Sequence, residues 1–387
     1  MSKMPACDVA ILGPHLNNDI VMAEALTYNG FNCVVLRDAN TGRPDPTIFP
    51  TGLKYFSLDQ VRVCRSSLEF FRACMGARCI VTYSGFLTSV LRYFWFVARI
   101  LPFPPIINVP SGSDITELAL QRSRAAWLYR DLLRRAAFTV IPTYPYAIKA
   151  LKQLKLPRFV FIKYPYFLPD ALEPAEVGGG GGEKIVYLHV SNLDWGAVDN
   201  KPGRNSTKGN DRFIRAFAAA VRAGAPIKCI MLDRGPDRLA ARKIIAELGV
   251  ESAFEWVNSV LPHELRKLVS TADIVVDQFD VGGLGAIAME TMSLAKPLMI
   301  HLDQDCLPLI YDKAPPVLNC STEAEIHDVI LSHLDRAALH ALGLRAEKWV
   351  RKNHGTEHAM EEFLLRLCLV AGIPHPPRRF SALTDNV

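Results

Sequence analysis

Two residues in the second half of the chain have the charge and the setting to bind a phosphate group. Arg204 lies in a polar loop, and Lys208 follows four positions later, directly before Gly209 and a helical pattern. A cation beside the free N–H groups and the positive dipole end of a helix stabilises a diphosphate. The sequence therefore predicts an anion site at Arg204 and Lys208, with an exposed basic loop as the alternative.

A glycine-led turn is the second candidate for phosphate chemistry. Gly282, Gly283, Leu284 and Gly285 lie between an apolar strand pattern and a helical pattern that contains Glu290. Glycine N–H groups carry no side chain beside them, so phosphate oxygens can approach closely. Asp280, just before the turn, offers a further polar group, whereas a partly exposed helix acid is the plain interpretation of Glu290.

The elements that would position these residues alternate regularly in both halves. Apolar strand patterns lie at 7–14, 33–36, 78–83, 105–109 and 138–142, and again at 185–190, 227–232, 254–257, 274–279 and 298–300. Helical patterns separate them, at 20–29, 211–222, 237–248, 262–270 and 286–294 among others. Such alternation indicates parallel sheets covered on both faces, whose ligands bind beyond the carboxyl ends of the strands. We expect an α/β fold of two doubly wound, Rossmann-like domains facing a cleft.

A run of five glycines, Gly178 to Gly182, divides the two halves. It fits neither a helix nor a strand, and 387 residues exceed the usual size of a single core. We expect an N-terminal domain at 1–170, a linker at 171–183 and a C-terminal domain at 184–353. A helical pattern at about 354–372, after a break near 353–355, is expected to complete the N-terminal domain.

The order and spacing of these segments resemble the retaining glycosyltransferases of GT-B fold, of the family 4 type also called glycosyl transferases group 1. The resemblance covers nearly the whole chain. It implies that Arg204 and Lys208 hold the diphosphate of a nucleoside diphosphate sugar, and that Glu290 binds the nucleotide ribose. The family usually has a second, earlier glutamate in this segment, and Gly282 stands in its place here.

Further site residues follow from the same resemblance. Asn258 and Val260 lie in the segment whose backbone recognises the nucleotide base in the family. Ser111 and Asp114 belong to a Gly-Ser-Asp turn after a strand, although many members have a histidine where Ser111 stands. Asp114 has a plain alternative, as the N-cap of a helix that begins near Thr116.

The loop after the first strand is the last candidate. Gly13 and His15 occupy the position from which this loop faces the diphosphate or the acceptor in the family. A structural or solvated histidine is the alternative for His15.

The resemblance implies transfer of a hexosyl group to an acceptor hydroxyl with retention and without a metal ion. Arg204, Lys208 and Asp114 are the expected catalytic residues, and no cofactor is expected beyond the nucleoside diphosphate sugar as co-substrate. Neither the donor base and sugar nor the acceptor can be inferred. A sugar-nucleotide 2-epimerase and a noncatalytic partner protein of the same architecture remain as alternatives.

The two halves differ in charge. Residues 1–170 contain 20 Lys and Arg against 11 Asp and Glu, and the remainder contains 24 against 28. Arginines lie among aromatic residues at 92–99 and 122–135. Two interpretations stay open: contact with an anionic membrane or a lipid-linked acceptor, and a solvated basic face over a buried aromatic stripe. No nucleic-acid recognition element is present in the sequence, so a nucleic-acid partner is not expected.

The expected location is the cytoplasm, with the inner face of the membrane as an option. The N-terminal residues lack the pattern of a signal peptide. Arginines and prolines interrupt the apolar stretch 86–109, so no spanning helix is expected there. Nine cysteines are scattered without metal-ligand spacing, so we expect reduced, mostly buried thiols and no metal site.

Overall fold

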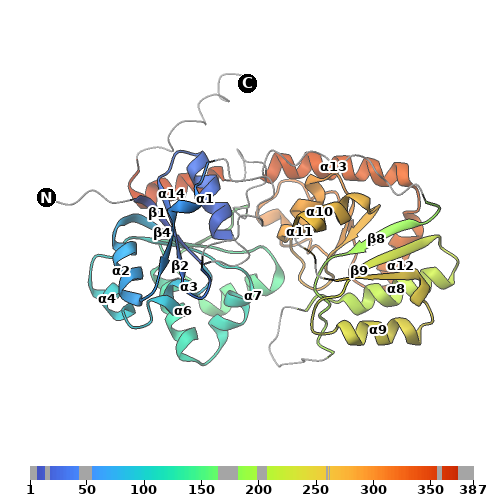
Figure 1. The fold of residues 1–387 in the computed structure, drawn as a ribbon, viewed down its shortest axis with the longest axis horizontal. Helices are drawn as coiled ribbons and strands as arrows, with labels where there is room; N and C mark the ends of the chain where they lie inside the picture. Colours follow the sequence, from blue (N-terminus) through green and yellow to red (C-terminus); the bar gives the residue numbers. More distant parts are fainter. Residues whose placement is uncertain are drawn as a thin grey trace, which may run out of the picture. The chain divides into compact units, whose positions relative to one another are not determined.

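The computed structural model describes residues 7–13, 18–42, 55–163, 182–197, 207–258, 260, 262–354 and 360–373. The chain divides into two compact units, Met1–Pro169 with His354–Val387, and Asp170–Asn353 (Figure 1). Three parts of the sequence prediction lie outside the described residues: His15, Arg204 and the linker glycines from 178 to 181.

The N-terminal unit contains a seven-stranded sheet, in the order β3-β2-β1-β4-β5-β6-β7, with every pair parallel. Its strands are β1 (Cys7–Leu12), β2 (Cys33–Asp38), β3 (Val61–Cys64), β4 (Ala77–Tyr83), β5 (Ile106–Val109), β6 (Phe138–Val140) and β7 (Phe159–Val160). Its helices are α1 (Asn18–Tyr28), α2 (Ser67–Met75), α3 (Phe86–Val90), α4 (Trp95–Ile100), α5 (Ser113–Thr116), α6 (Arg124–Arg135), α7 (Pro145–Leu154) and α14 (Glu361–Ala371), with 3₁₀ turns at Leu58–Gln60 and Leu118–Leu120.

Helices cover both faces of this sheet. Val9 and Ile11 of β1 pack in one apolar cluster, and Ala10 and Leu12 pack in another, because successive strand residues point to opposite faces. The first cluster includes residues of α1 and α14, and the second includes residues of α2, α3, α6 and α7 (Figure 1). Phe363 of α14 lies 6.2 Å from Phe138, measured between ring centroids. The C-terminal helix is thus part of the N-terminal core.

The C-terminal unit contains a six-stranded parallel sheet in the order β10-β9-β8-β11-β12-β13. Its strands are β8 (Ile185–His189), β9 (Ile227–Leu232), β10 (Phe254–Val257), β11 (Ile274–Val276), β12 (Leu298–Ile300) and β13 (Leu318–Asn319). Its helices are α8 (Asn210–Arg222), α9 (Arg238–Glu247), α10 (Pro262–Thr271), α11 (Ala286–Ser293), α12 (Glu323–Ser332) and α13 (Arg336–His354), with 3₁₀ turns at Glu251–Ala253 and Leu307–Leu309. The expected α/β fold with two doubly wound sheets is confirmed.

One difference from the predicted elements concerns the strand expected at 274–279. The observed strand β11 ends at Val276. The amide of Phe279 donates to the carbonyl oxygen of Lys208 at 2.7 Å instead of continuing the ladder with β12. The predicted strand was therefore too long, and its last residues form a loop at the carboxyl edge of the sheet.

Two whole-chain expectations can be compared with the described residues. All nine cysteines lie among them, and each is buried and free, as expected. None of the helices described has both the length and the apolar composition needed to cross a bilayer.

Candidate functional site

The carboxyl edge of the C-terminal sheet has its switch point between β8 and β11. These adjacent strands pair in register, with Val276 beside His189. From β8 the chain proceeds to β9 on one side, and β11 lies on the other side. The loops that follow the two strands therefore diverge, which is where doubly wound sheets bind ligands. The residues that follow β8, β9 and β11 form the candidate site.

Lys208 is fixed at this edge through its backbone. Its amide donates to the carbonyl oxygen of Asp194 at 2.5 Å, and its own carbonyl accepts from Phe279. The next residue, Gly209, adopts a φ of +64° and caps α8. This φ strains a residue that has a Cβ, so glycine is favoured here, and a Cβ would also have to displace the guanidinium of Arg212.

A buried polar network supports the same edge. The Asn210 Nδ2 donates to His189 Nε2 at 2.9 Å and to Ser191 Oγ at 3.0 Å. Ser191 Oγ in turn donates to the Asp277 carbonyl at 2.6 Å, which joins the loops after β8 and β11. Burial, together with the charge of Arg234, lowers the pKa of His189 to about 3. The imidazole is therefore neutral, as required to accept from an amide.

Two cations flank a buried carboxyl group at the switch point. Burial raises the pKa of Asp277, and the charges of Lys208 and Arg234 oppose that rise. Arg234 donates through Nη2 to the Val190 carbonyl at 2.6 Å. Among the described atoms its buried Nε has no acceptor. With both cations charged, their positive charge exceeds what a single carboxylate can neutralise, so the edge suits an anionic ligand.

Sequence reasoning did not identify Arg234 or Asp277. Arg234 lies just after β9, whose end was predicted, and this place beyond a strand end was the signal that could have identified it. Asp277 lies just after β11 but inside the strand predicted at 274–279, so that signal was hidden for it.

The glycine-led turn lies in the loop between β11 and α11. Gly282 has a φ of +78°, and its carbonyl accepts from the Asp303 amide at 3.0 Å. The Gln278 Oε1 accepts from Val281 at 2.7 Å, and its Nε2 donates to the carbonyls of Gly283 and His301. Gly285 is the N-cap of α11 and, having no side chain, makes no side-chain capping bond. These bonds fix the turn, and the phosphate contacts of its N–H groups stay a prediction.

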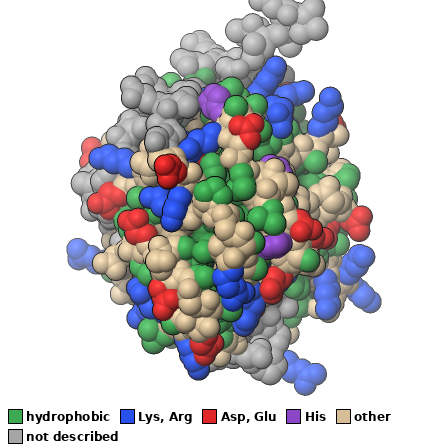
Figure 2. All heavy atoms as spheres, turned by 90° about the vertical axis from the view of Figure 1, so that its right-hand side faces the viewer, with side chains coloured by type: hydrophobic (Ala, Val, Ile, Leu, Met, Phe, Trp, Pro, Cys, Tyr) green, Lys and Arg blue, Asp and Glu red, His purple; other side chains and the backbone are tan. Residues whose placement is uncertain are grey.

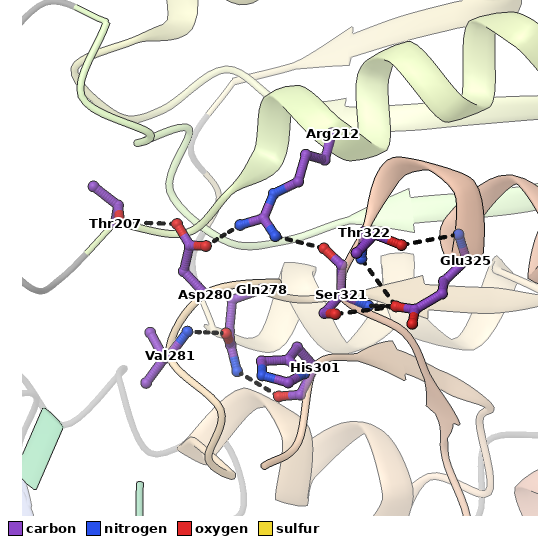
Figure 3. A network of polar contacts seen from close by, with 9 residues as sticks. All are labelled: Thr207, Arg212, Gln278, Asp280, Val281, His301, Ser321, Thr322 and Glu325. Carbon is purple, nitrogen blue, oxygen red and sulfur yellow. Dashed lines mark hydrogen bonds and ion pairs between the residues drawn. The ribbon is translucent and has the colours of Figure 1, made fainter. Parts of the chain in front are cut away.

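Asp280 holds this turn to the start of α8 (Figure 3). Its carboxylate forms an ion pair with Arg212 and accepts from Thr207 Oγ1 at 2.8 Å. Arg212 also donates to the carbonyl of Ser321. Asp280, which the sequence suggested as a polar group for the ligand, thus connects the loops of the site to one another.

The other predicted residues of this unit lie at the same edge. Glu290 is a half-buried residue of α11 and lies five positions after its N-cap. Asn258 is exposed and Val260 half-buried, beyond the end of β10. The amide of Asp233 donates to the carbonyl oxygen of Val257 at 2.8 Å, so Asn258 and Val260 adjoin the loop after β9. The glycine-led turn follows β11, which lies on the far side of β8. Their ligand contacts stay predictions.

In the N-terminal unit, Gly13, Ser111 and Asp114 follow β1 and β5, on either side of β4. Gly13 has a φ of +110°, and a Cβ there would lie 2.8 Å from the Tyr83 Cβ. Only glycine therefore lets the loop after β1 pass the end of β4 so closely. The hydroxyls of Ser84 and Ser111 share a hydrogen bond.

Asp114 is buried, and both of its oxygens accept hydrogen bonds. One accepts from the amides of Ser111 and Gly112, at 3.0 and 2.8 Å, and the other from the Tyr129 hydroxyl at 2.6 Å. The suggested N-cap role is wrong, because α5 begins at Ser113 with Gly112 as its cap, and Asp114 lies inside the first turn. Burial raises the pKa of Asp114, opposed chiefly by the Tyr129 bond. The catalytic role stays a prediction.

A pocket of about 700 Å³ opens at this edge of the N-terminal unit. Gly13 and Asp114 line it, together with the hydroxyls of Ser84, Thr88 and Ser89, the arginines Arg92 and Arg124, and the apolar side chains of Phe86, Leu118 and Leu128. Ser84, Thr88, Ser89 and the two arginines were not predicted as pocket residues. Hydroxyls and two cations on apolar walls fit an amphiphilic ligand with hydroxyl or anionic groups.

Within the described ranges, no three His, Cys, Asp or Glu side chains converge in a way that could hold a metal ion.

Residues 203–304 match the family described as Glycosyl transferases group 1. They include Lys208, Arg234, Asp277, the glycine-led turn and Glu290. This part of the chain is therefore similar to the glycosyl transferases of group 1.

Other comparisons agree with this assignment. The chain is 22% identical over 225 residues to an alpha-D-kanosaminyltransferase of Streptomyces kanamyceticus, covering 54% of this chain and 55% of that protein. The match thus spans about half the length of the curated relative.

Solved structures match the fold over nearly the whole chain. Sucrose-phosphate synthase from Thermosynechococcus elongatus has a TM-score of 0.60 at 14% identity, covering 95% of this chain and 100% of that one. Anabaena Alr3699/HepE, in complex with UDP and glucose, has a TM-score of 0.63 at 13% identity, covering 93% and 99%. The fold is that of the GT-B glycosyltransferases, as expected from the sequence.

Proposed function

We propose that the C-terminal unit binds a nucleoside diphosphate sugar and that the chain transfers its glycosyl group to an acceptor hydroxyl. The observation that carries the proposal is the pair of cations, Lys208 and Arg234, beside buried Asp277 at the switch point of the C-terminal sheet. The donor diphosphate would lie on these cations and on the glycine-led turn. The relative HepE has been solved with UDP and with UDP-glucose, so a uridine diphosphate sugar is the first donor to test.

The proposed role of Lys208 and Arg234 in the reaction is to stabilise the leaving diphosphate. When the bond from the anomeric carbon to the β-phosphate oxygen breaks, negative charge grows on that phosphate. Preorganised cations at such a site lower a barrier by several kcal/mol, about 3 for a single donor group. We propose that Lys208 and Arg234, together with Arg204, supply this charge in place of a metal ion.

Transfer with retention is the second part of the proposal. The acceptor oxygen would attack on the face from which the diphosphate leaves, and its proton would pass to a β-phosphate oxygen. This route needs no enzymatic nucleophile. Asp277 is buried, and Asp280 is held by Arg212 and Thr207, so neither carboxylate is assigned that role. The hydroxyl-lined pocket of the N-terminal unit is the proposed acceptor site.

The experiment begins with a thermal-shift screen against uridine, guanosine, adenosine and thymidine diphosphates. The corresponding sugar nucleotides are then incubated with the protein and a panel of simple glycosides, with and without a chelator. NMR of the product should show the anomeric configuration of the donor, and the chelator should leave the rate unchanged.

Other outcomes would redirect the assignment. An inverted product would contradict retention, and loss of turnover with the chelator would contradict metal independence. A donor epimerised at C2 would indicate the epimerase alternative. Donor binding without hydrolysis or transfer to any acceptor in the panel would indicate a noncatalytic partner protein.

A further inference from the structure

Large apolar side chains are exposed on one part of the N-terminal unit. Tyr93, Phe96 and Ile100 are 67%, 68% and 67% exposed, and Leu101 and Trp127 are about half exposed. They belong to the segments 92–101 and 120–127, which contain α4 and the start of α6, and which we call the α4–α6 surface. Exposed apolar residues are ordinary when single, whereas a group of them marks an interaction surface.

The exposed residues form one group because α4 and α6 pack side by side. Phe96 and Ile100 are four residues apart and share a face of α4. The guanidinium of Arg99, on the same helix, lies 5.9 Å from the Trp127 ring centroid on α6. Tyr93 lies three residues before Phe96, and the Arg92 guanidinium lies 4.6 Å from its ring.

Other aromatic residues of the same segment point inward and hold it in place. Trp95 is buried and donates through Nε1 to Asp131 of α6 at 2.8 Å. Phe94 stacks on Phe71 of α2, with ring centroids 5.7 Å apart. The outward side chains are therefore presented by an anchored segment. The sequence alternative of a buried aromatic stripe describes Trp95 and Tyr129, but not Tyr93, Phe96 or Trp127.

The charge of the α4–α6 surface is of one sign. No Asp or Glu occurs between Glu69 and Asp114, or between Glu117 and Asp131. Asp131 itself is engaged by Trp95, Arg99 and Arg135. The basic side chains of the surface are Arg92, Arg99, Arg122 and Arg124, and all four residues are exposed. By contrast, the face of the molecule in Figure 2 mixes acidic and basic side chains throughout.

The pocket of the N-terminal unit shares its rim with this surface. Arg92, Tyr93, Arg124 and Ala125 line the pocket and also belong to the α4–α6 surface. A partner on the surface would therefore lie at the pocket, which connects the surface to a place where a ligand fits.

We propose that the α4–α6 surface binds the surface of an anionic lipid bilayer. Tyrosine and tryptophan favour the membrane interface, and Phe96 and Ile100 can enter its apolar edge. Arginines near an anionic bilayer each strengthen binding about fivefold. A second copy of this chain is disfavoured as the occupant, because in a twofold contact the arginines of one copy would face those of the other. Membrane binding does not depend on the proposed function.

The test is flotation of the full chain with vesicles at low salt. Vesicles of phosphatidylcholine alone are compared with vesicles that also contain phosphatidylglycerol, and high salt is a third condition. The protein should float with the anionic vesicles only, and high salt should release most of it.

Two double variants and two controls identify the surface. The variant Phe96→Ser with Ile100→Ser, and the variant Arg92→Gln with Arg124→Gln, should each bind anionic vesicles at least tenfold more weakly, with unchanged circular dichroism. The controls are Leu369→Ser, at a leucine of α14 that is 83% exposed, and Lys152→Gln, at an exposed lysine of α7; both should bind like the wild type.

Three results would overturn the proposal. The first is absence of the wild type from the anionic vesicles at low salt, and the second is equal loss of binding in the controls. The third is a dimer in light scattering without vesicles that the Phe96→Ser, Ile100→Ser variant dissociates, which would assign the surface to a second copy.

Discussion

The backbone amide of Phe279 donates to the carbonyl oxygen of Lys208 at 2.7 Å, joining the loop after β11 to the start of α8. Because this bond uses only the backbone, it places Lys208 at the switch point whatever its side chain is. Substitution of the Lys208 side chain should therefore remove a charge from the site and leave its framework intact.

The loop after β9 depends on Gly235. This residue has a φ of +112°, and a Cβ on it would overlap the backbone of Leu193. Leu193 is held there by bonds to Arg234 and Asp237, so it cannot move aside. We expect Gly235→Ala to lower the free energy of unfolding by about 3 kcal/mol, from strain and overpacking together.

Gly224→Ala is the matched control for this loop. Gly224 has a φ of +87° but nothing within 4 Å of its Cβ position, so only the backbone strain of about 1 to 2 kcal/mol is expected. Thermal denaturation measures both variants. Equal losses of stability would show that the approach of Leu193 to Gly235 does not matter.

The neutral His189 should make the protein sensitive to acid. Burial lowers the pKa of His189 from 6.5 to about 3, so between these values the unfolded chain binds a proton that the folded chain does not. The contribution of neutral His189 to the free energy of unfolding is therefore fully present above about pH 6.5. It is lost as the pH falls toward 3, by at most about 1.4 kcal/mol per pH unit. His354, whose pKa is also lowered to about 3 by burial, contributes in the same direction.

Denaturant unfolding between pH 7 and pH 4 tests the effect. The variant His189→Gln has no imidazole at this position, and its stability should depend less steeply on pH than that of the wild type. The comparison uses the slope, because the substitution can also change stability at every pH. Identical slopes would mean that His189 is not the titrating group.

The alternation of apolar runs and helices was enough to predict both sheets. The strands β9, β10 and β12 were predicted at their observed bounds, because each is a mainly apolar run between turn residues. The strands β3, β7 and β13 were missed. They have two to four residues and lie at or near sheet edges, so their local sequences carry little apolar signal.

The residues of the candidate site were predictable where the local sequence of a single segment indicates their structure. The pair Lys208–Gly209 indicates the start of a helix, and the glycine-led turn indicates a close approach of the backbone. Contacts between distant segments were not predictable: the Asp280–Arg212 pair and the placement of Arg234 beside Asp277 depend on the order of strands in the sheet. The N-cap alternative for Asp114 failed for a similar reason, because its partner Tyr129 lies on another helix.

Variants of Asp114 and of its hydrogen-bond partner Tyr129 can distinguish a catalytic role of Asp114 from a structural role. The variant Tyr129→Phe removes the 2.6 Å hydrogen bond but keeps the carboxylate, whereas Asp114→Asn removes the negative charge from the pocket. If the charge acts on the bound substrate, Asp114→Asn should lower kcat roughly 100-fold and Tyr129→Phe much less. Steady-state kinetics provide the measurement, with the donor and acceptor that the proposed screen and incubations identify. Similar losses in both variants would leave Asp114 with a structural role alone.

The central claim is that Lys208 and Arg234 bind the donor diphosphate. Calorimetric titration with the nucleoside diphosphate selected by the thermal-shift screen tests it most directly. Lys208→Ala and Arg234→Ala should each weaken binding roughly 10- to 100-fold, as loss of a charge-assisted hydrogen bond does. Lys267→Ala, at an exposed lysine of α10, should bind as the wild type does. Wild-type affinity in both Lys208→Ala and Arg234→Ala would contradict the account.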